Sequence, residues 1–172
     1  WRWPPPPPLA QPAPDQAQAW QRERAIRALD QWLDVERVET AVDELYAVST
    51  RFKPDLIVSE MFVAAAGIVA EMASVPFVVA GWPARPVRNR GSDELTEIAR
   101  TRLDTLLDRF QVQGAHWTAS GPPALWSSRL HITYWSERWY TGVPLAGQTR
   151  HAGGIRGQAH TPDHRLPAPG ED

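Results

Sequence analysis

The spacing of hydrophobic residues predicts three amphipathic helices. Apolar positions recur mostly three or four residues apart over three stretches, which is the spacing of a single helix face. The stretches are 15–33, 35–48 and 95–110. Ser92 is expected to cap the third helix, and the acidic residues that follow it place negative charge at the positive end of the helix dipole.

Between the second and third stretches the pattern changes to short apolar runs. Residues 55–58 and 76–80 each form one such run, which is typical of a strand buried on both faces. The alanine-rich segment 62–73 between them contains Gly67 and predicts a helix that packs closely against a sheet. Strand, helix and strand in this order form a βαβ unit, so we expect parallel strands and a right-handed crossover. Residues 130–134 alternate apolar and polar positions and are expected to add a strand, and 143–153 is expected to hold one more short extended piece.

Composition excludes several classes of protein. The chain has 172 residues, a formal net charge of -2, 42% hydrophobic residues and 22% charged residues, which argues against a polybasic nucleic-acid binder or a disordered acidic tail. Cysteine is absent, so disulfides, thiol nucleophiles and cysteine-bound metals are excluded. No apolar run is long enough to predict a membrane span. Only Lys53 of the 18 basic residues is a lysine, which we attribute to genomic base composition. We expect a bacterial, cytoplasmic protein.

The chain is expected to contain one α/β domain between two irregular ends. Residues 1–14 are dominated by proline and predict an extended polyproline II segment, either a ligand for an SH3-like groove or, more simply, a linker. Residues 15–155 are expected to form a Rossmann-like parallel sheet with flanking helices. Residues 156–172 are polar and proline-containing, which is typical of a linker or tail. Because the first residue is Trp1, we expect the chain to begin inside a longer reading frame or to be processed.

The predicted topology indicates where a ligand would bind. Parallel sheets bind ligands outside the carboxyl ends of their strands. Glu60 follows the first predicted strand and Trp82 follows the second, so both are expected at one crevice. Glu60 is either a partly buried functional carboxylate or a charge that complements the start of the next helix. Trp82 either stacks on a ligand or packs under the arginine-containing loop 85–90. Ser59 lacks the surroundings of a serine nucleophile.

Metal and cofactor sites are not expected. His160 and His164 have the spacing of a helical metal pair, but they lie in a proline-containing tail without a third ligand. No glycine-rich phosphate loop is present, so no tightly held nucleotide cofactor is expected. A loop arginine such as Arg85 could meet a phosphate or carboxylate, although a solvated loop is the usual explanation.

Three segments together resemble a known enzyme family. The first is KPDLIVSEMFVAAAGIVAEMASVPFVVAGWPA, the second is LHITYWSERWY and the third is TRHAGGIRG. Their order and spacing resemble the N-terminal, acceptor-binding domain of GT-B glycosyltransferases of the UDP-glucuronosyl/UDP-glucosyltransferase superfamily. The resemblance covers roughly residues 18–157 and implies an incomplete GT-B N-terminal domain.

The resemblance implies sugar transfer from a nucleotide-sugar donor to the hydroxyl of a small-molecule acceptor, with inversion at the anomeric carbon. The family's orienting carboxylate, which holds a histidine base, falls on Glu60. Acceptor contacts are implied at Met61, Phe62, Trp82 and Arg85. The family's glycine-histidine turn is missing from this sequence, and so is its nucleotide-sugar-binding domain. The chain is therefore expected to supply acceptor-side structure and to be inactive alone.

Two other interpretations remain open. A non-catalytic α/β accessory module would dock a partner chain, because a sheet without its first strands leaves apolar surface to be covered. A flavodoxin-like domain would instead carry a bound small ligand. The reading frame upstream distinguishes the glycosyltransferase fragment from the accessory module, and a flavin or nucleotide retained on purification would favour the third interpretation.

Overall fold

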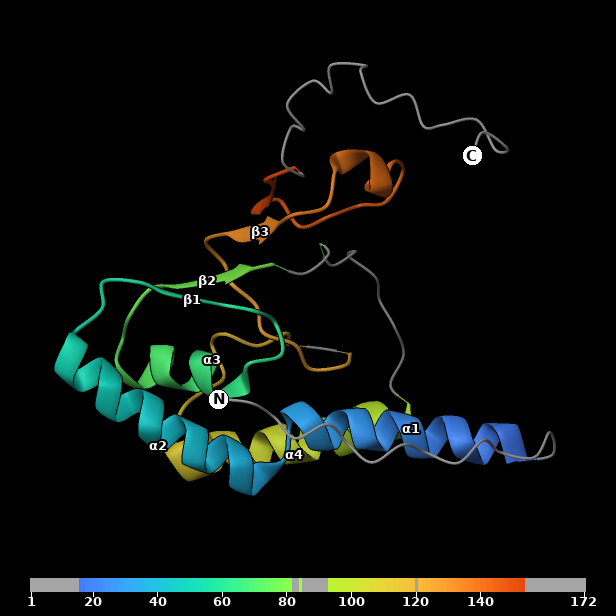
Figure 1. Cartoon of the computed structure of the whole chain (residues 1–172), viewed down its shortest axis with the longest axis horizontal. Coiled ribbons are helices and arrows are strands. Elements are labelled where there is room, and N and C mark those ends of the chain that lie inside the picture. The colour runs from blue at the N-terminus through green and yellow to red at the C-terminus, as the bar shows by residue number, and fades with distance from the viewer. Residues whose placement is uncertain (1–15, 82–83, 85–92, 120, 154–172) are drawn as a thin grey trace, which may run out of the picture.

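A computed structural model describes residues 16–81, 84, 93–119 and 121–153. The predicted proline-rich segment, the predicted tail, Trp82 and Arg85 lie outside these residues. Four helices and four strands follow the predicted order (Figure 1). They are α1 (Ala17–Trp32), α2 (Val35–Phe52), β1 (Ile57–Ser59), α3 (Ala64–Met72), β2 (Phe77–Ala80), α4 (Glu94–Phe110), β3 (His131–Thr133) and β4 (Thr149–His151), with a short 3-10 helix, η2 (Glu137–Tyr140), before β4.

The four strands form one sheet in the order β1-β2-β3-β4, and every neighbouring pair is parallel. This confirms the predicted fold class, a Rossmann-like α/β fold with a parallel sheet and flanking helices. In the predicted βαβ unit, Ile57 is paired with Phe77 and Ser59 with Val79. The backbone N–H of Ile57 donates to the carbonyl of Pro76 at 2.9 Å, which fixes the start of this register.

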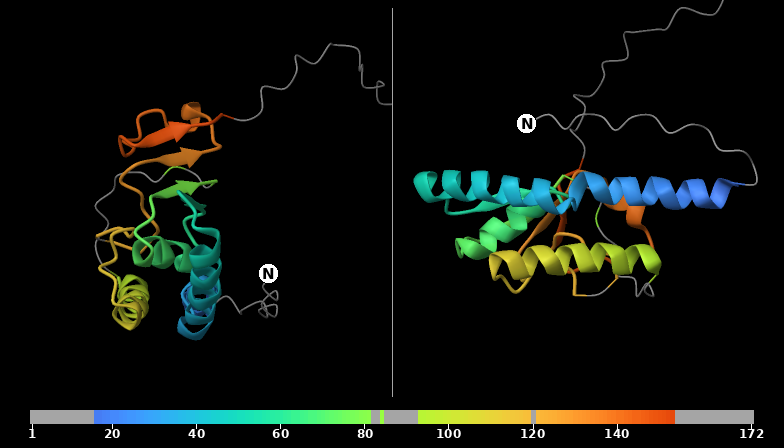
Figure 2. Two further views of the ribbon diagram at one scale, coloured as in Figure 1. Left: turned by 90° about the vertical axis from the view of Figure 1, so that its left-hand side faces the viewer. Right: turned by 90° about the horizontal axis from the view of Figure 1, so that it is seen from below.

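Small residues allow α3 to lie deep in the molecule. Every residue from Ala64 to Ala70 is buried. A Cβ added at Gly67 would overlap Cδ2 of Leu125, so the absence of a side chain lets the 121–130 loop lie directly on the helix. The two perpendicular views in Figure 2 show α3 between the sheet and the outer helices, with α2 and α4 on its two sides.

The core lies between β2, α3 and the inner faces of α2 and α4. Phe77 and Val79 point into it, because alternate residues of a strand face opposite sides of a sheet. Val58 projects from the opposite face of the sheet and is 55% exposed. The core also includes Leu33, Val38, Val42, Ile68, Leu103, Leu106 and Trp117.

Two of the helices, α2 and α4, begin at an aspartate whose side chain caps them, which corrects one sequence-based expectation. The N-cap of α4 is Asp93, whose carboxylate accepts from the backbone N–H of Thr96 at 2.8 Å, rather than Ser92. Asp34 caps α2 in the same way, accepting from the N–H of Arg37 at 2.9 Å. Within the described part of the chain, no helix combines the length and hydropathy that a membrane span requires.

Candidate functional site

The carboxyl ends of all four parallel strands meet at one edge of the sheet, hereafter the carboxyl edge. Glu60 follows β1, Gly81 follows β2, Tyr134 follows β3 and Ala152 follows β4. The side chains of Glu60 and Tyr134 flank Gly81: a Cβ built there would lie 3.7 Å from Glu60 Oε1 and 3.7 Å from Tyr134 Cε2. Gly81 has a φ of 105°, which only glycine adopts without strain. A carboxylate and a phenol are therefore brought together beside an open stretch of backbone.

The surroundings of Glu60 differ from both sequence-based interpretations. Its side chain is exposed, not partly buried. It also lies outside the first turn of α3, which begins at Ala64, has Val63 as N-cap and contains no acidic residue. Glu60 approaches α3 through its backbone, whose carbonyl accepts from the N–H of Val63 at 3.4 Å. The carboxylate is thus accessible from solvent at the carboxyl edge.

Two of the other predicted acceptor-binding residues, Met61 and Phe62, lie in different surroundings. Met61 is only 9% exposed and belongs to the core, where its carbonyl accepts from the N–H of Leu125 at 3.3 Å. Phe62 is partly exposed, but its ring packs edge-on against Trp32 of α1 at 5.3 Å, which directs it towards the helices. Trp82 and Arg85 lie outside the described residues.

Four rings lie at the same edge, beyond β3 and β4. We call Trp135, Trp139, Tyr140 and His151 the aromatic patch. Trp135 and Trp139 meet edge to face at 5.4 Å and are 44% and 73% exposed. The rings of Tyr140 and His151 lie 5.4 Å apart. The hydroxyl of Tyr140 accepts a hydrogen bond of 2.7 Å from the N–H of Ala84, which links the patch to the segment after β2.

His151 is held in a defined tautomer. Its Nδ1 lies 2.9 Å from the carbonyl oxygen of Trp135, and because a carbonyl can only accept, Nδ1 carries the proton. Nε2 then presents its lone pair. His151 lies in a segment that resembles the family, but its residue type alone predicts no chemical role, because its partner is a backbone atom that no motif reveals.

Glu60 and His151 do not form a carboxylate–histidine pair. Glu60 follows β1 and His151 is the last residue of β4, and these strands are separated by three inter-strand spacings of about 4.8 Å, or about 14 Å in all. A hydrogen bond needs less than a quarter of that separation. The carboxyl edge therefore has two separate chemical centres, one at Glu60 and one at the aromatic patch.

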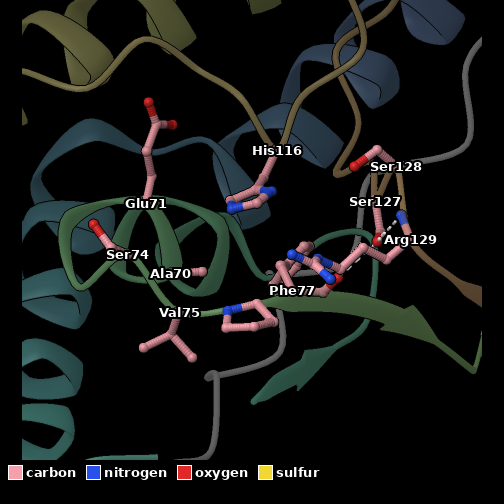
Figure 3. A pocket seen from close by; sticks show the side chains of 10 residues that line it. Ala70, Glu71, Ser74, Val75, Phe77, His116, Ser127, Ser128 and Arg129 are labelled. Atoms are coloured by element: carbon pink, nitrogen blue, oxygen red, sulfur yellow. Dashed lines mark hydrogen bonds between the residues drawn. The ribbon is translucent and has the colours of Figure 1, made fainter. Parts of the chain in front are cut away.

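A cavity of about 400 Å³ lies at the opposite, amino-terminal edge of the sheet (Figure 3). His116 lines it with its ring 5.0 Å from Phe77, and partial burial lowers the pKa of His116, although the Glu71 carboxylate opposes this. The hydroxyl of Ser127 donates to the carbonyl of Phe77 at 2.6 Å, so it is not available as a nucleophile. The carboxylate of Glu71 accepts from the N–H groups of Gln113 and Ala115. The polar groups here hold loops in place, and the cavity is remote from Glu60.

Among the described residues, no group of three or more histidine, aspartate or glutamate side chains is arranged to hold a metal ion. Comparison of the chain with protein-family models, with curated proteins and with solved structures gives no match. Proposals about function therefore rest on the sequence and on the geometry of the carboxyl edge.

Proposed function

We propose that this chain forms the acceptor-side part of an inverting glycosyltransferase. The observation that carries the proposal is the position of Glu60, beside Gly81 and Tyr134 at the carboxyl edge of an all-parallel sheet. This is the edge at which open α/β sheets bind ligands. The resemblance of three ordered segments to the family's acceptor domain supplies the reaction. A bacterial cytoplasmic location belongs to the same proposal and rests on composition alone.

In this reaction the acceptor hydroxyl attacks the anomeric carbon of the donor sugar. The bond to the nucleotide diphosphate breaks, the diphosphate leaves with the bonding electron pair, and a base takes the hydroxyl proton. The resemblance gives Glu60 the task of orienting that base from behind. His151 is too far from Glu60 to be the partner, so the base and the donor site would both come from elsewhere. The chain alone is then expected to bind an acceptor without transferring sugar.

Ligand-observed NMR on the full chain tests acceptor binding, with 4-nitrophenol and a flavonol as probes. Tyr134→Ala is expected to weaken binding, because the phenol ring forms one wall beside Gly81. Tyr46→Ala is the matched control, since Tyr46 is an exposed tyrosine on α2, away from the carboxyl edge. Equal effects of the two substitutions would contradict the placement of the acceptor. Glucose transfer from UDP-glucose by the chain alone would contradict the acceptor-side assignment.

A second candidate, a non-catalytic module that docks a partner chain, is favoured by the edge strand β1 and the exposed apolar side chains on its outer face. Within the described residues β1 pairs only with β2, and Leu56 and Val58, which lie on the face opposite the core, are 47% and 55% exposed. Exposed apolar strand edges are sites of association. Val58→Lys should abolish any concentration-dependent association measured by light scattering, whereas Val48→Lys on α2 should not. A chain that stays monomeric at high concentration would show that this edge does not pair with a second copy of the chain.

A further inference from the structure

We propose that the aromatic patch is a docking site for the proline run Pro4–Pro8 of the same chain. The patch is a connected set of rings, of which the two tryptophans are exposed and the other two are half-buried. Trp139 contacts Trp135, the carbonyl of Trp135 bonds His151, and His151 contacts Tyr140. Aromatic surfaces of this kind recognise polyproline II segments, which lose little conformational entropy on binding because they are already extended. The inference is independent of the proposed glycosyltransferase function.

Hydrogen-bonding chemistry favours this occupant. Proline has no backbone N–H, so a run of five prolines offers carbonyl acceptors and no donors. The aromatic patch offers the hydrogen-bond donors that these carbonyls need. An indole N–H can only donate, and two indoles are exposed there. The hydroxyl of Tyr140 already accepts from the N–H of Ala84, which leaves its own proton to donate. The flat rings cover the apolar proline rings, and the donors meet their carbonyls.

The first prolines of the run can reach across the molecule. Residues 9–16 connect the run to α1 and span about 25 Å when extended at about 3.1 Å each. The five prolines add about 15 Å, so Pro4 can lie up to about 40 Å from the start of α1. A domain of this size has a radius of gyration of about 15 Å, so that reach is comparable with its diameter. Tethering also raises the local concentration of the run to the millimolar range, at which even a docking with a Kd of about 1 mM is substantially populated.

The experiment uses the absence of cysteine from the full chain. Ala10→Cys provides a single attachment point for a nitroxide label next to the proline run. The indole N–H signals of Trp135 and Trp139, assigned through Trp→Phe variants, are then recorded with the label oxidised and reduced. Docking predicts that both signals lose most of their intensity in the oxidised sample, while the signal of the buried Trp117 keeps its intensity. Equal intensities for all three tryptophans would overturn the proposal.

Two variants make the test specific. Trp139→Ala should restore the Trp135 signal, whereas Phe52→Ala, which removes an equally exposed ring from the end of α2, should not. Replacing Pro4–Pro8 by Gly-Ser-Gly-Ser-Gly should also restore both signals. Broadening that persists after this replacement would show proximity without recognition of proline and would overturn the proposal.

A mixed sample identifies the source of the run. Chain that is enriched in nitrogen-15 but carries no nitroxide is mixed with nitroxide-labelled chain of natural isotope composition. Broadening of the observed signals can then arise only between molecules. The proposal predicts no broadening in this mixture. Broadening of the same size as in the singly labelled chain would assign the patch to the proline run of a second copy. That result would overturn the intramolecular docking.

Discussion

At the scale of single residues, Glu71 shows how one carboxylate organises a loop far away in the sequence. It lies near the end of α3 and accepts from the backbone N–H of Gln113 at 2.6 Å and of Ala115 at 2.9 Å. These bonds hold the segment that leads from α4 to the buried Trp117. Backbone donors in such a turn would otherwise need water or another acceptor.

We expect Glu71→Ala to lower the free energy of unfolding by about 2 kcal/mol, because hydrogen bonds to charged groups contribute roughly 1.5–3 kcal/mol. Urea denaturation followed by circular dichroism measures the change. Glu44→Ala removes an exposed glutamate from α2 and serves as the control, with an expected change of less than about 0.5 kcal/mol. Similar losses in the two variants would show that the Glu71 bonds contribute little.

His116 predicts a dependence of stability on pH. Partial burial lowers the pKa of His116 in the folded chain, so the unfolded chain, with a histidine pKa of about 6.5, takes up the proton more readily. The contribution of His116 to the free energy of unfolding is therefore fully present above about pH 6.5. It is lost as the pH falls below that value through the folded pKa.

The ring proton signals of His116, followed by NMR from pH 7.5 downwards, should titrate below pH 6.5. Glu71→Gln removes the carboxylate that raises the pKa of His116, so its titration should move to still lower pH. In parallel, His116→Gln should reduce the loss of unfolding free energy between pH 6.5 and 5. A titration midpoint above 6.5 in the folded chain would contradict the burial effect.

At the scale of elements, Asp93 decides where α4 begins. Its carboxylate satisfies the N–H of Thr96, one of the donors that the first turn of a helix leaves without an intrahelical partner. Asp93→Ala should therefore lower the unfolding free energy by about 1 kcal/mol. Asp93→Asn keeps a side-chain oxygen at the same place and should lose clearly less. Thermal unfolding monitored by circular dichroism compares the two, and an equal loss would show that the charge, not the hydrogen bond, is what matters.

The elements were predictable where local pattern and tertiary role agree. The local pattern predicts a βαβ unit: two short apolar runs, around Ile57 and Phe77, flank the small residues of α3. The structure has this unit, with β1 and β2 parallel. The strand within 143–153 was expected only as a short extended piece. It forms three residues of β4, because its pairing depends on β3 rather than on its own hydrophobicity. Ser92 was an equally good capping residue by type, and the choice of Asp93 rests on backbone geometry.

At the scale of the whole molecule, the site was predictable only in part. Parallel strands bring their carboxyl ends to one edge whatever the side chains are, so the edge location of Glu60 follows from the topology. Met61 is one residue further on and lies in the core, because the chain turns inward there to start α3. The aromatic patch depends on contacts between η2 and β4. Its key bond, from His151 to the carbonyl of Trp135, involves a backbone atom that residue types do not indicate.

Stability is expected to differ between the helices, because α1 and α3 are buried to very different extents. Residues from Ala64 to Ala70 of α3 are buried on every side, whereas α1 contains no buried residue. The beginning of α1 is held on α4 by an exposed ion pair between Arg22 and Glu94, and its end by one of 2.7 Å between Asp30 and Arg102. Exposed ion pairs contribute little and weaken in salt. Only its last turn, at Leu29 and Trp32, packs against the core.

Hydrogen exchange should therefore begin in α1. Amides of residues 17–28 are expected to exchange well before those of α3 and β2, which should open only when the whole chain unfolds. Raising the salt concentration, or replacing Arg102 by Gln, should speed exchange in α1 alone, because it removes the attraction to α4 and leaves the core contacts intact. Mass spectrometry of peptic fragments resolves the two regions. Equal protection of α1 and α3 would mean that α1 is part of the cooperative core, in which case its stability would have to come from contacts other than the two ion pairs.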